Sequence, residues 1–245
     1  KLYKSGHYTQ REAASIATNF SICSLGFFAL LASIGGIMDY LPHMIISSFI
    51  INFVLAAVVT RLPPLNHKQD IYFDGQPVQE RAEAGEQSGN ILMRACSAAA
   101  ERASMTGPDV FYKYFWEAVT FAQKIVAYIL SIATIALIIG TYTPLFDYLG
   151  VVFEPLLNLL ALPDADKIAP TVLLSIAEIA LPAIIISGAD VAPMSVFFVC
   201  TLSTIQIIFF TESANAMLES DIPLSVKELV VIFLIRTVLA IPLVA

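Results

Sequence analysis

The chain has 245 residues, of which 58% are hydrophobic and 13% are charged, and its mean hydropathy is +0.78. Soluble domains carry about 25% charged residues, so this composition predicts a protein that lies in a lipid bilayer. The net charge of −7 argues against nucleic acid as a partner, because nucleic-acid-binding proteins present basic faces. The cysteines Cys23, Cys96 and Cys200 lack zinc-ligand spacing, so we expect no metal or other cofactor.

Residues 1–60 predict a first pair of membrane-spanning helices. Thr9 and Glu12 have the spacing of a capping box, so the first helix is expected to begin at the next residue and to continue to about Gly36. Its length is sufficient to cross a bilayer. The apolar run 44–60 predicts the second helix, which ends before two consecutive prolines.

Hydroxyl side chains cluster within the first predicted helix. Thr18, Ser21 and Ser24 follow each other at intervals of three residues, which places them on one helical face. Such hydroxyls either hold neighbouring helices together or line a polar path. Both interpretations stay open for Thr18 and Ser21.

The segment 61–107 is polar and is expected to form a loop with a surface helix. The segments up to Arg11 and from Arg61 onward through this loop hold most of the basic residues, eight of the thirteen Lys and Arg. An even number of spans places these two segments on one side. The positive-inside rule makes that side cytoplasmic.

Residues 108–245 predict a second helical unit. Its first span extends to residue 140, and the interrupted stretch 144–162 is expected to form an interfacial or re-entrant helix pair. Two apolar segments of near-spanning length occupy 170–211, and a last span covers 226–245. The predicted fold class is therefore an all-α polytopic membrane protein with about five to six spans.

Glu178 is the strongest candidate for a binding residue. It lies inside an apolar segment, where a carboxylate is costly unless it faces protein, water or a ligand. It can bind a solute hydroxyl or amine, or exchange a proton. The alternative is a structural ion pair with Arg236, which is also expected at membrane depth.

Four further polar residues are candidates for substrate binding. Ser203 and Gln206 lie one turn apart, and Glu212 and Asn215 have the same spacing. Each pair can contact a polar solute, whereas interhelical hydrogen bonds or capping explain them about as well. Asp190, in a turn, is expected to cap the next helix.

Four stretches of the sequence resemble the YjiH family of bacterial membrane proteins: YKSGHYTQREAASIATNFSICS, RLPPLNHKQDIYFDG, AEIALPA and FLIRTVLAIP. That family carries the Gate, or nucleoside-recognition, domain, which also occurs in concentrative nucleoside transporters, ferrous iron permeases and spore maturation proteins. The resemblance implies solute transport, a Gate-like second unit and further helices upstream. The similarity of ATNFSICSLGFF to CTLSTIQIIFF is consistent with an internal duplication.

These features predict a multi-pass transporter or permease of the bacterial cytoplasmic membrane. The resemblance implies a small, nucleoside-like polar solute, with Na⁺ or H⁺ as coupling ion. The alternative is a non-catalytic membrane assembly subunit, which would act with a partner membrane subunit or as a homo-oligomer. We expect no enzyme, because no P-loop, GxSxG or HExxH signature occurs in the sequence.

Overall fold

The computed structural model describes residues 3–78, 93, 96–97, 99–100 and 107–245. In these ranges the chain forms helices and no strand, apart from one isolated bridge between Ile71 and Pro77. The predicted all-α class is therefore confirmed for the described residues. The surface helix predicted within 61–107 falls mainly outside them.

The first predicted helix is interrupted, and this corrects the expectation of a continuous helix to Gly36. Helix α1 covers Gln10–Phe20 and α2 covers Leu25–Ile34. The predicted capping box is present, since Thr9 Oγ1 accepts from the Glu12 N–H at 3.2 Å and Glu12 Oε2 accepts from the Thr9 N–H at 2.9 Å. The break removes the predicted common face of Thr18, Ser21 and Ser24.

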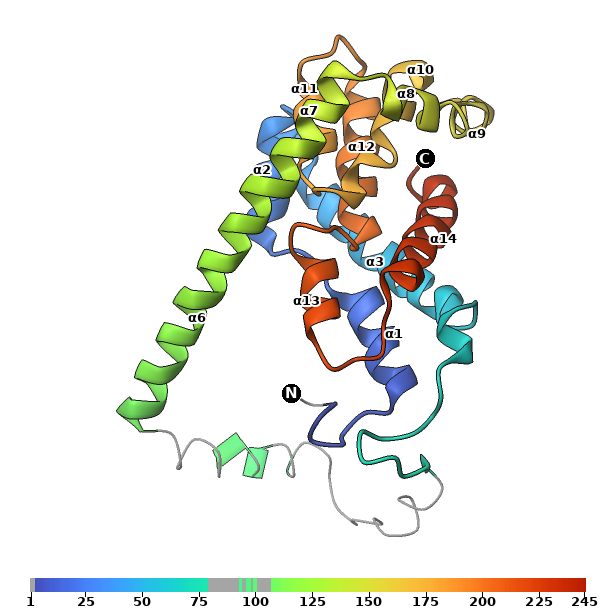
Figure 1. Cartoon of the computed structure of the whole chain (residues 1–245). Coiled ribbons are helices and arrows are strands. Elements are labelled where there is room, and N and C mark those ends of the chain that lie inside the picture. Colours follow the sequence, from blue (N-terminus) through green and yellow to red (C-terminus); the bar gives the residue numbers. More distant parts are fainter. Residues whose placement is uncertain (1–2, 79–92, 94–95, 98, 101–106) are drawn as a thin grey trace.

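The second predicted helix is confirmed. A short 3-10 turn, Met38–Tyr40, leads into α3, Leu41–Val59, and a further 3-10 turn follows at Leu65–His67. Helix α3 crosses the centre of the molecule in Figure 1.

The helix predicted after residue 108 is long and largely exposed. It consists of α6, Pro108–Tyr128, a π-helical turn at Ile129–Ala133, and α7, Thr134–Tyr142. Only 6% of its most apolar stretch is buried. In Figure 1 it extends as an arm beside the other helices.

The predicted interrupted stretch is confirmed as two short helices. These two helices are α8, Leu145–Gly150, and α9, Glu154–Leu159. They are followed by α10, Ala165–Ile168, and by 3-10 turns at Ala169–Thr171 and Leu174–Ile176. A Cβ atom at Gly150 would lie 2.6 Å from the backbone of Ala169, so α8 packs there on bare backbone.

The pair expected within 170–211 is shorter and more irregular than predicted. Its regular parts are α11, Leu181–Ser187, and α12, Pro193–Gln206. Asp190 does not cap α12. Instead, Asp164 accepts from the Ala192 N–H at 2.8 Å and from the Ser195 hydroxyl at 3.4 Å.

The last helices are α13, Ser213–Glu219, and α14, Val226–Val244, which confirms the predicted terminal helix. Helices α3, α12 and α14 pack against each other and form the centre of the buried core.

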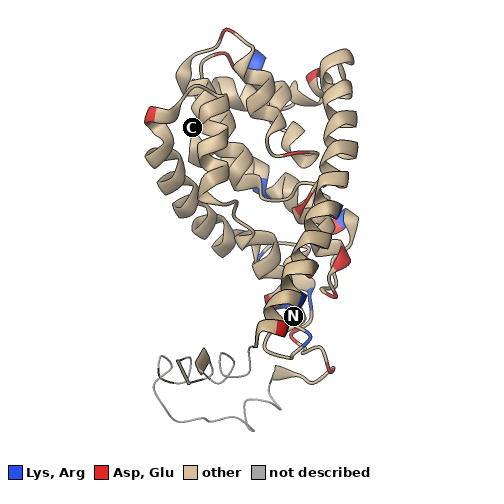
Figure 2. Ribbon diagram, turned by 90° about the vertical axis from the view of Figure 1, so that its left-hand side faces the viewer, with Lys and Arg blue, Asp and Glu red and all other residues tan. Residues whose placement is uncertain are grey.

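Among the described residues, three helical stretches are long and apolar enough to cross a membrane: Gln10–Ile34, Met38–Val59 and Pro108–Tyr142. They suggest a membrane protein. In Figure 2 many of the ribbon segments coloured for Lys, Arg, Asp and Glu lie near the end that carries the N-terminus, while most of the helical ribbon belongs to other residues.

Candidate functional site

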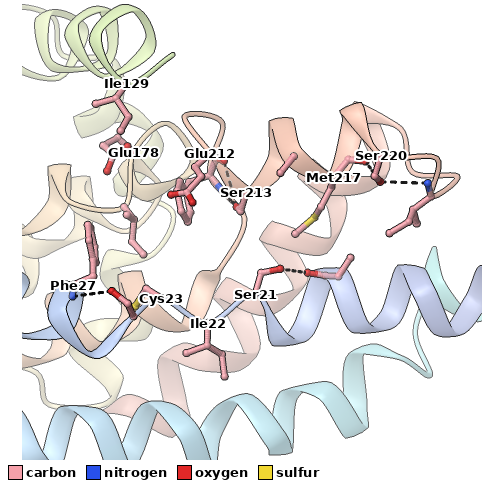
Figure 3. A pocket seen from close by; sticks show the side chains of 16 residues that line it. Ser21, Ile22, Cys23, Phe27, Ile129, Glu178, Glu212, Ser213, Met217 and Ser220 are labelled. Atoms are coloured by element: carbon pink, nitrogen blue, oxygen red, sulfur yellow. Dashed lines mark hydrogen bonds between the residues drawn. The ribbon is translucent and has the colours of Figure 1, made fainter. Parts of the chain in front are cut away.

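Three interruptions of helical structure meet around one cavity of about 480 Å³. They are the break between α1 and α2, the irregular stretch before α11, and the break between α12 and α13. Glu178 and Glu212 line the cavity from one side, and Ser21 and Cys23 line it from the other (Figure 3). Interrupted helices at membrane depth occur where backbone lines a cavity or is buried in protein.

Local side-chain hydrogen bonds accompany the end of α1 at Phe20. The Asn19 amide donates to the Ser15 carbonyl at 2.8 Å, and the Ser21 hydroxyl donates to the Ala17 carbonyl at 2.7 Å. Side chains that bond neighbouring carbonyls compete with the helical ladder. Ser24 then caps α2, because its Oγ accepts from the Phe27 N–H at 3.3 Å.

The end of α12 contains a strained residue. Ile207 has φ +64°, a left-handed conformation that β-branched residues rarely adopt. Ser213 compensates by hydrogen bonding, since its Oγ donates to the Ile207 carbonyl at 2.6 Å and accepts from the Phe209 N–H at 3.0 Å. Such strained positions persist where the surroundings hold them, and they cluster at functional sites.

The backbone of one break pairs with the backbone of another. The Phe210 N–H donates to the Ile176 carbonyl at 2.8 Å, and the Thr211 N–H donates to the Ala177 carbonyl at 3.2 Å. The Thr211 hydroxyl also donates to Glu178 Oε2. Backbone groups that helices would otherwise satisfy are therefore bonded between segments, which fixes Glu178 at the cavity.

The cavity presents negative groups. Glu178 is 8% exposed and its Oε1 accepts from the Ala180 N–H at 3.2 Å, while Glu212 is exposed to the cavity. The lining contains no Lys, Arg or His side chain among the described residues. The arrangement can accept hydrogen bonds from hydroxyl or amine groups of a solute, or attract a cation.

The structure brings three of the seven candidate residues to the cavity: Ser21, Glu178 and Glu212. Thr18 is buried and donates to the Ala14 carbonyl at 2.8 Å. The Asn215 amide donates to the Phe210 carbonyl, inside the same break region but outside the lining. Asn215, on α13, therefore lies beside the cavity and does not line it.

Gln206 and Ser203 lie within the core, outside the cavity lining. Gln206 Nε2 donates to the Val172 carbonyl at 2.8 Å and to Thr237 Oγ1 at 2.7 Å, and its Oε1 accepts from Ser175. The Ser203 hydroxyl donates to the Cys200 carbonyl at 2.9 Å. Both side chains are thus bonded within the protein, and Gln206 joins α12 to α14.

Arg236 does not pair with Glu178, and this corrects the alternative interpretation of both residues. Its guanidinium donates to Asn19 Oδ1 at 2.6 Å, to Asn52 Oδ1 at 2.5 Å and to the Ile205 carbonyl at 2.6 Å. It is 0% exposed, and within the described residues no carboxylate forms an ion pair with it. The Arg236 network therefore ties the ends of α1 and α12 to α3 and α14.

The sequence did not identify the uncharged residues that line the cavity or hold the helix breaks. Thr211, Ser213 and Cys23 belong to the breaks or line the cavity, but no pattern in the sequence distinguishes them from other small polar residues. The signal that could have found the breaks is the polar run before each of them, Thr18-Asn19 in α1 and Ser203 to Gln206 in α12. Within the described part of the chain, no group of three His, Cys, Asp or Glu side chains could hold a metal ion.

The chain is similar over its whole length to a protein of Alkalihalophilus pseudofirmus that is described as uncharacterised. The two are 35% identical over 248 residues, which cover 100% of this chain and 53% of the relative. The chain therefore spans about half the length of the curated relative that it matches. No protein-family profile matches the chain, and no solved structure resembles it significantly.

Proposed function

We propose that the chain belongs to a multi-pass transporter or permease of the bacterial cytoplasmic membrane and that the cavity at the helix breaks holds a small polar solute. One observation carries this proposal: three interrupted segments converge on a cavity that presents Glu178 and Glu212. Discontinuous helices whose ends surround a central site are typical of secondary transporters.

The lining supports a solute with hydrogen-bond donors. Glu178 and Glu212 supply acceptors, while Ser21 supplies a hydroxyl that can donate or accept. A nucleoside-like molecule carries suitable hydroxyl groups, and a coupling Na⁺ or H⁺ would be attracted by the same carboxylates. In this proposal Glu178 orients the solute, because its own position is fixed by Thr211 and the Ala180 N–H.

The break positions also support a Gate-like duplication. The two similar stretches, ATNFSICSLGFF and CTLSTIQIIFF, each contain a helix end, at Phe20 and at Gln206. In this arrangement α1 with α2 and α12 with α13 are two broken elements that face the same cavity. In this topology the face that carries the N-terminus is cytoplasmic.

The proposal is tested by thermal stability of the purified protein in the presence of nucleosides, amino acids, Na⁺ and divalent cations. A bound solute at a hundred times its Kd adds about 2.7 kcal/mol of stability, which a melting shift reports. Glu178→Gln should abolish or weaken the shift, and Glu117→Gln, on the exposed arm α6, should leave it unchanged. Equal stabilisation of both variants would remove Glu178 from the site.

The second candidate is a non-catalytic membrane assembly subunit, favoured by the exposed arm. Helices α6 and α7 leave nearly all their apolar side chains unburied, which suits contact with lipid or with another membrane subunit. If this is the function, no solute in the screen will stabilise the protein, and Glu178→Gln will leave its assembly unchanged.

A further inference from the structure

A second cavity, of about 580 Å³, adjoins the cavity at the helix breaks. Tyr3, Lys4 and Tyr8 of the N-terminal segment line it. Three residues line both cavities, namely Ala17, Ser220 and Ile222. The two spaces are therefore neighbours that share these side chains as a partition.

Two apolar residues and one serine form the partition. Ala17, on α1, contributes a single methyl group, and Ile222 contributes a partly buried apolar side chain. Ser220 Oγ donates to the Met217 carbonyl at 2.6 Å and accepts from the Ile222 N–H at 3.3 Å. Two of the three partition residues, Ser220 and Ile222, thus belong to a short connection between α13 and α14 that is held by local hydrogen bonds.

An ion pair lies at the exposed rim of the second cavity. Lys4 Nζ lies 2.8 Å from Asp221 Oδ2, and the two side chains are 56% and 47% exposed. Asp221, at the rim, is the sequence neighbour of Ser220 and Ile222, which belong to the partition. An exposed pair of this kind contributes little stability, so opening it costs little.

We propose that solute moves between the cavity at the helix breaks and the face of the protein that carries the N-terminus through this second cavity. Ala17, Ser220 and Ile222 form the constriction of the route, and the Lys4–Asp221 ion pair is its outer latch. This inference rests on the proposed function, because it assigns a path to the site that the function requires. It adds that the cavity at the helix breaks is reached from the face that carries the N-terminus.

Native cysteines allow the route to be tested without a known solute. Cys23 lines the cavity at the helix breaks, Cys200 is fully buried, and Cys96 is exposed within the polar segment 61–107. In oriented membrane vesicles, a Cys23→Ser chain labelled at Cys96 by a membrane-impermeant maleimide identifies the face on which that segment lies. A Cys96→Ser chain then reports access to Cys23 from each face.

The route predicts that Cys23 reacts from the face that carries Cys96. Ile222→Trp, which fills the constriction, should abolish this labelling, and Val238→Trp, on the exposed face of α14, should leave it unchanged. Asp221→Asn should speed the labelling by up to about fivefold, the ratio that an exposed ion pair can hold. Salt should produce the same acceleration in the parent chain and none in Asp221→Asn, since salt screens exposed charges.

Labelling of Cys23 from the opposite face alone would overturn the route. Equal labelling of Ile222→Trp and Val238→Trp would overturn it as well. Cys200 must stay unlabelled in every variant, because its reaction reports unfolding, and Ala17→Leu offers a smaller obstruction if Ile222→Trp does not fold. The labelling needs no solute, so failure of the route is distinguishable from failure of the proposed function, which the solute screen decides.

Discussion

Replacing Arg236 by methionine should destabilise the protein by about 2–5 kcal/mol. The substitution leaves Asn19 Oδ1, Asn52 Oδ1 and the Ile205 carbonyl without their donor. A buried acceptor without a partner costs about 1–3 kcal/mol, so the three together cost about 3–9 kcal/mol. The loss is smaller than this sum because methionine also removes a buried charge, whose desolvation costs several kcal/mol.

A combined variant tests whether the loss of stability comes from the acceptors that Arg236→Met leaves without a donor. Arg236→Met with Asn19→Leu and Asn52→Leu removes the cation together with both amide acceptors, leaving only the Ile205 carbonyl. Apolar replacement of a whole buried ionic cluster is often neutral or stabilising, so this variant should recover most of the loss. Val238→Met, on the exposed face of α14, is the matched control and should melt like the parent.

The measurement uses the buried thiol of Cys200, which is 0% exposed and reacts with a thiol-specific dye only when the core opens. In a background with Cys23→Ser and Cys96→Ser, the temperature at which the dye reacts reports unfolding of α12. Unchanged melting of Arg236→Met would refute the reasoning, because the three acceptors would then need no donor. A combined variant as unstable as Arg236→Met alone would also refute it.

Two further predictions concern the face opposite the N-terminus. Gly150→Ala should destabilise the protein by about 1–3 kcal/mol, because the added Cβ would lie 2.6 Å from the Ala169 backbone. Gly188→Ala is the control: its Cβ would lie 3.8 Å from the nearest atom, so the variant should melt like the parent in the same assay. The hydrogen bond from the Ala192 N–H lowers the pKa of Asp164 below its ordinary value. The ionised carboxylate therefore stabilises the fold above about pH 4, the ordinary pKa of Asp in the unfolded chain. This stabilisation is lost as the pH falls through the lower pKa of the folded state. The melting difference between the parent and Asp164→Asn should therefore be present at neutral pH and vanish in acid, and a constant difference would contradict this assignment.

Helices that run uninterrupted were predictable from local pattern. The α3 helix and the α6 to α7 arm follow from long apolar runs, and the start of α1 follows from the Thr9–Glu12 capping box. In these cases each determinant lies within a few residues of its effect. Local propensity and length therefore suffice.

The breaks were predictable only in part: short polar runs precede two of them, but contacts between segments that lie far apart in the chain fix their geometry. Beyond Ile207, which has φ +64°, the carbonyls of Ile176 and Ala177 accept from the Phe210 and Thr211 N–H groups that the end of α12 releases. Arg236 likewise bonds Asn19 across 217 positions of sequence. Glu178 was identified as a cavity residue because a carboxylate in an apolar run is itself unusual, whereas Gln206 had the same apparent signal and is bonded inside the core.

The charges at the breaks follow the electrostatics of helix ends. Arg236 donates to the Ile205 carbonyl near the C-terminal end of α12, where a cation is stabilised by the helix dipole. Glu178 accepts from the Ala180 N–H at the start of α11, and Glu212 immediately precedes α13, so both carboxylates lie near N-terminal ends that favour negative charge. The chain itself therefore holds the half-helices and their carboxylates in place. Under the proposed function, a solute would meet polar groups that are already oriented, which lowers the cost of binding.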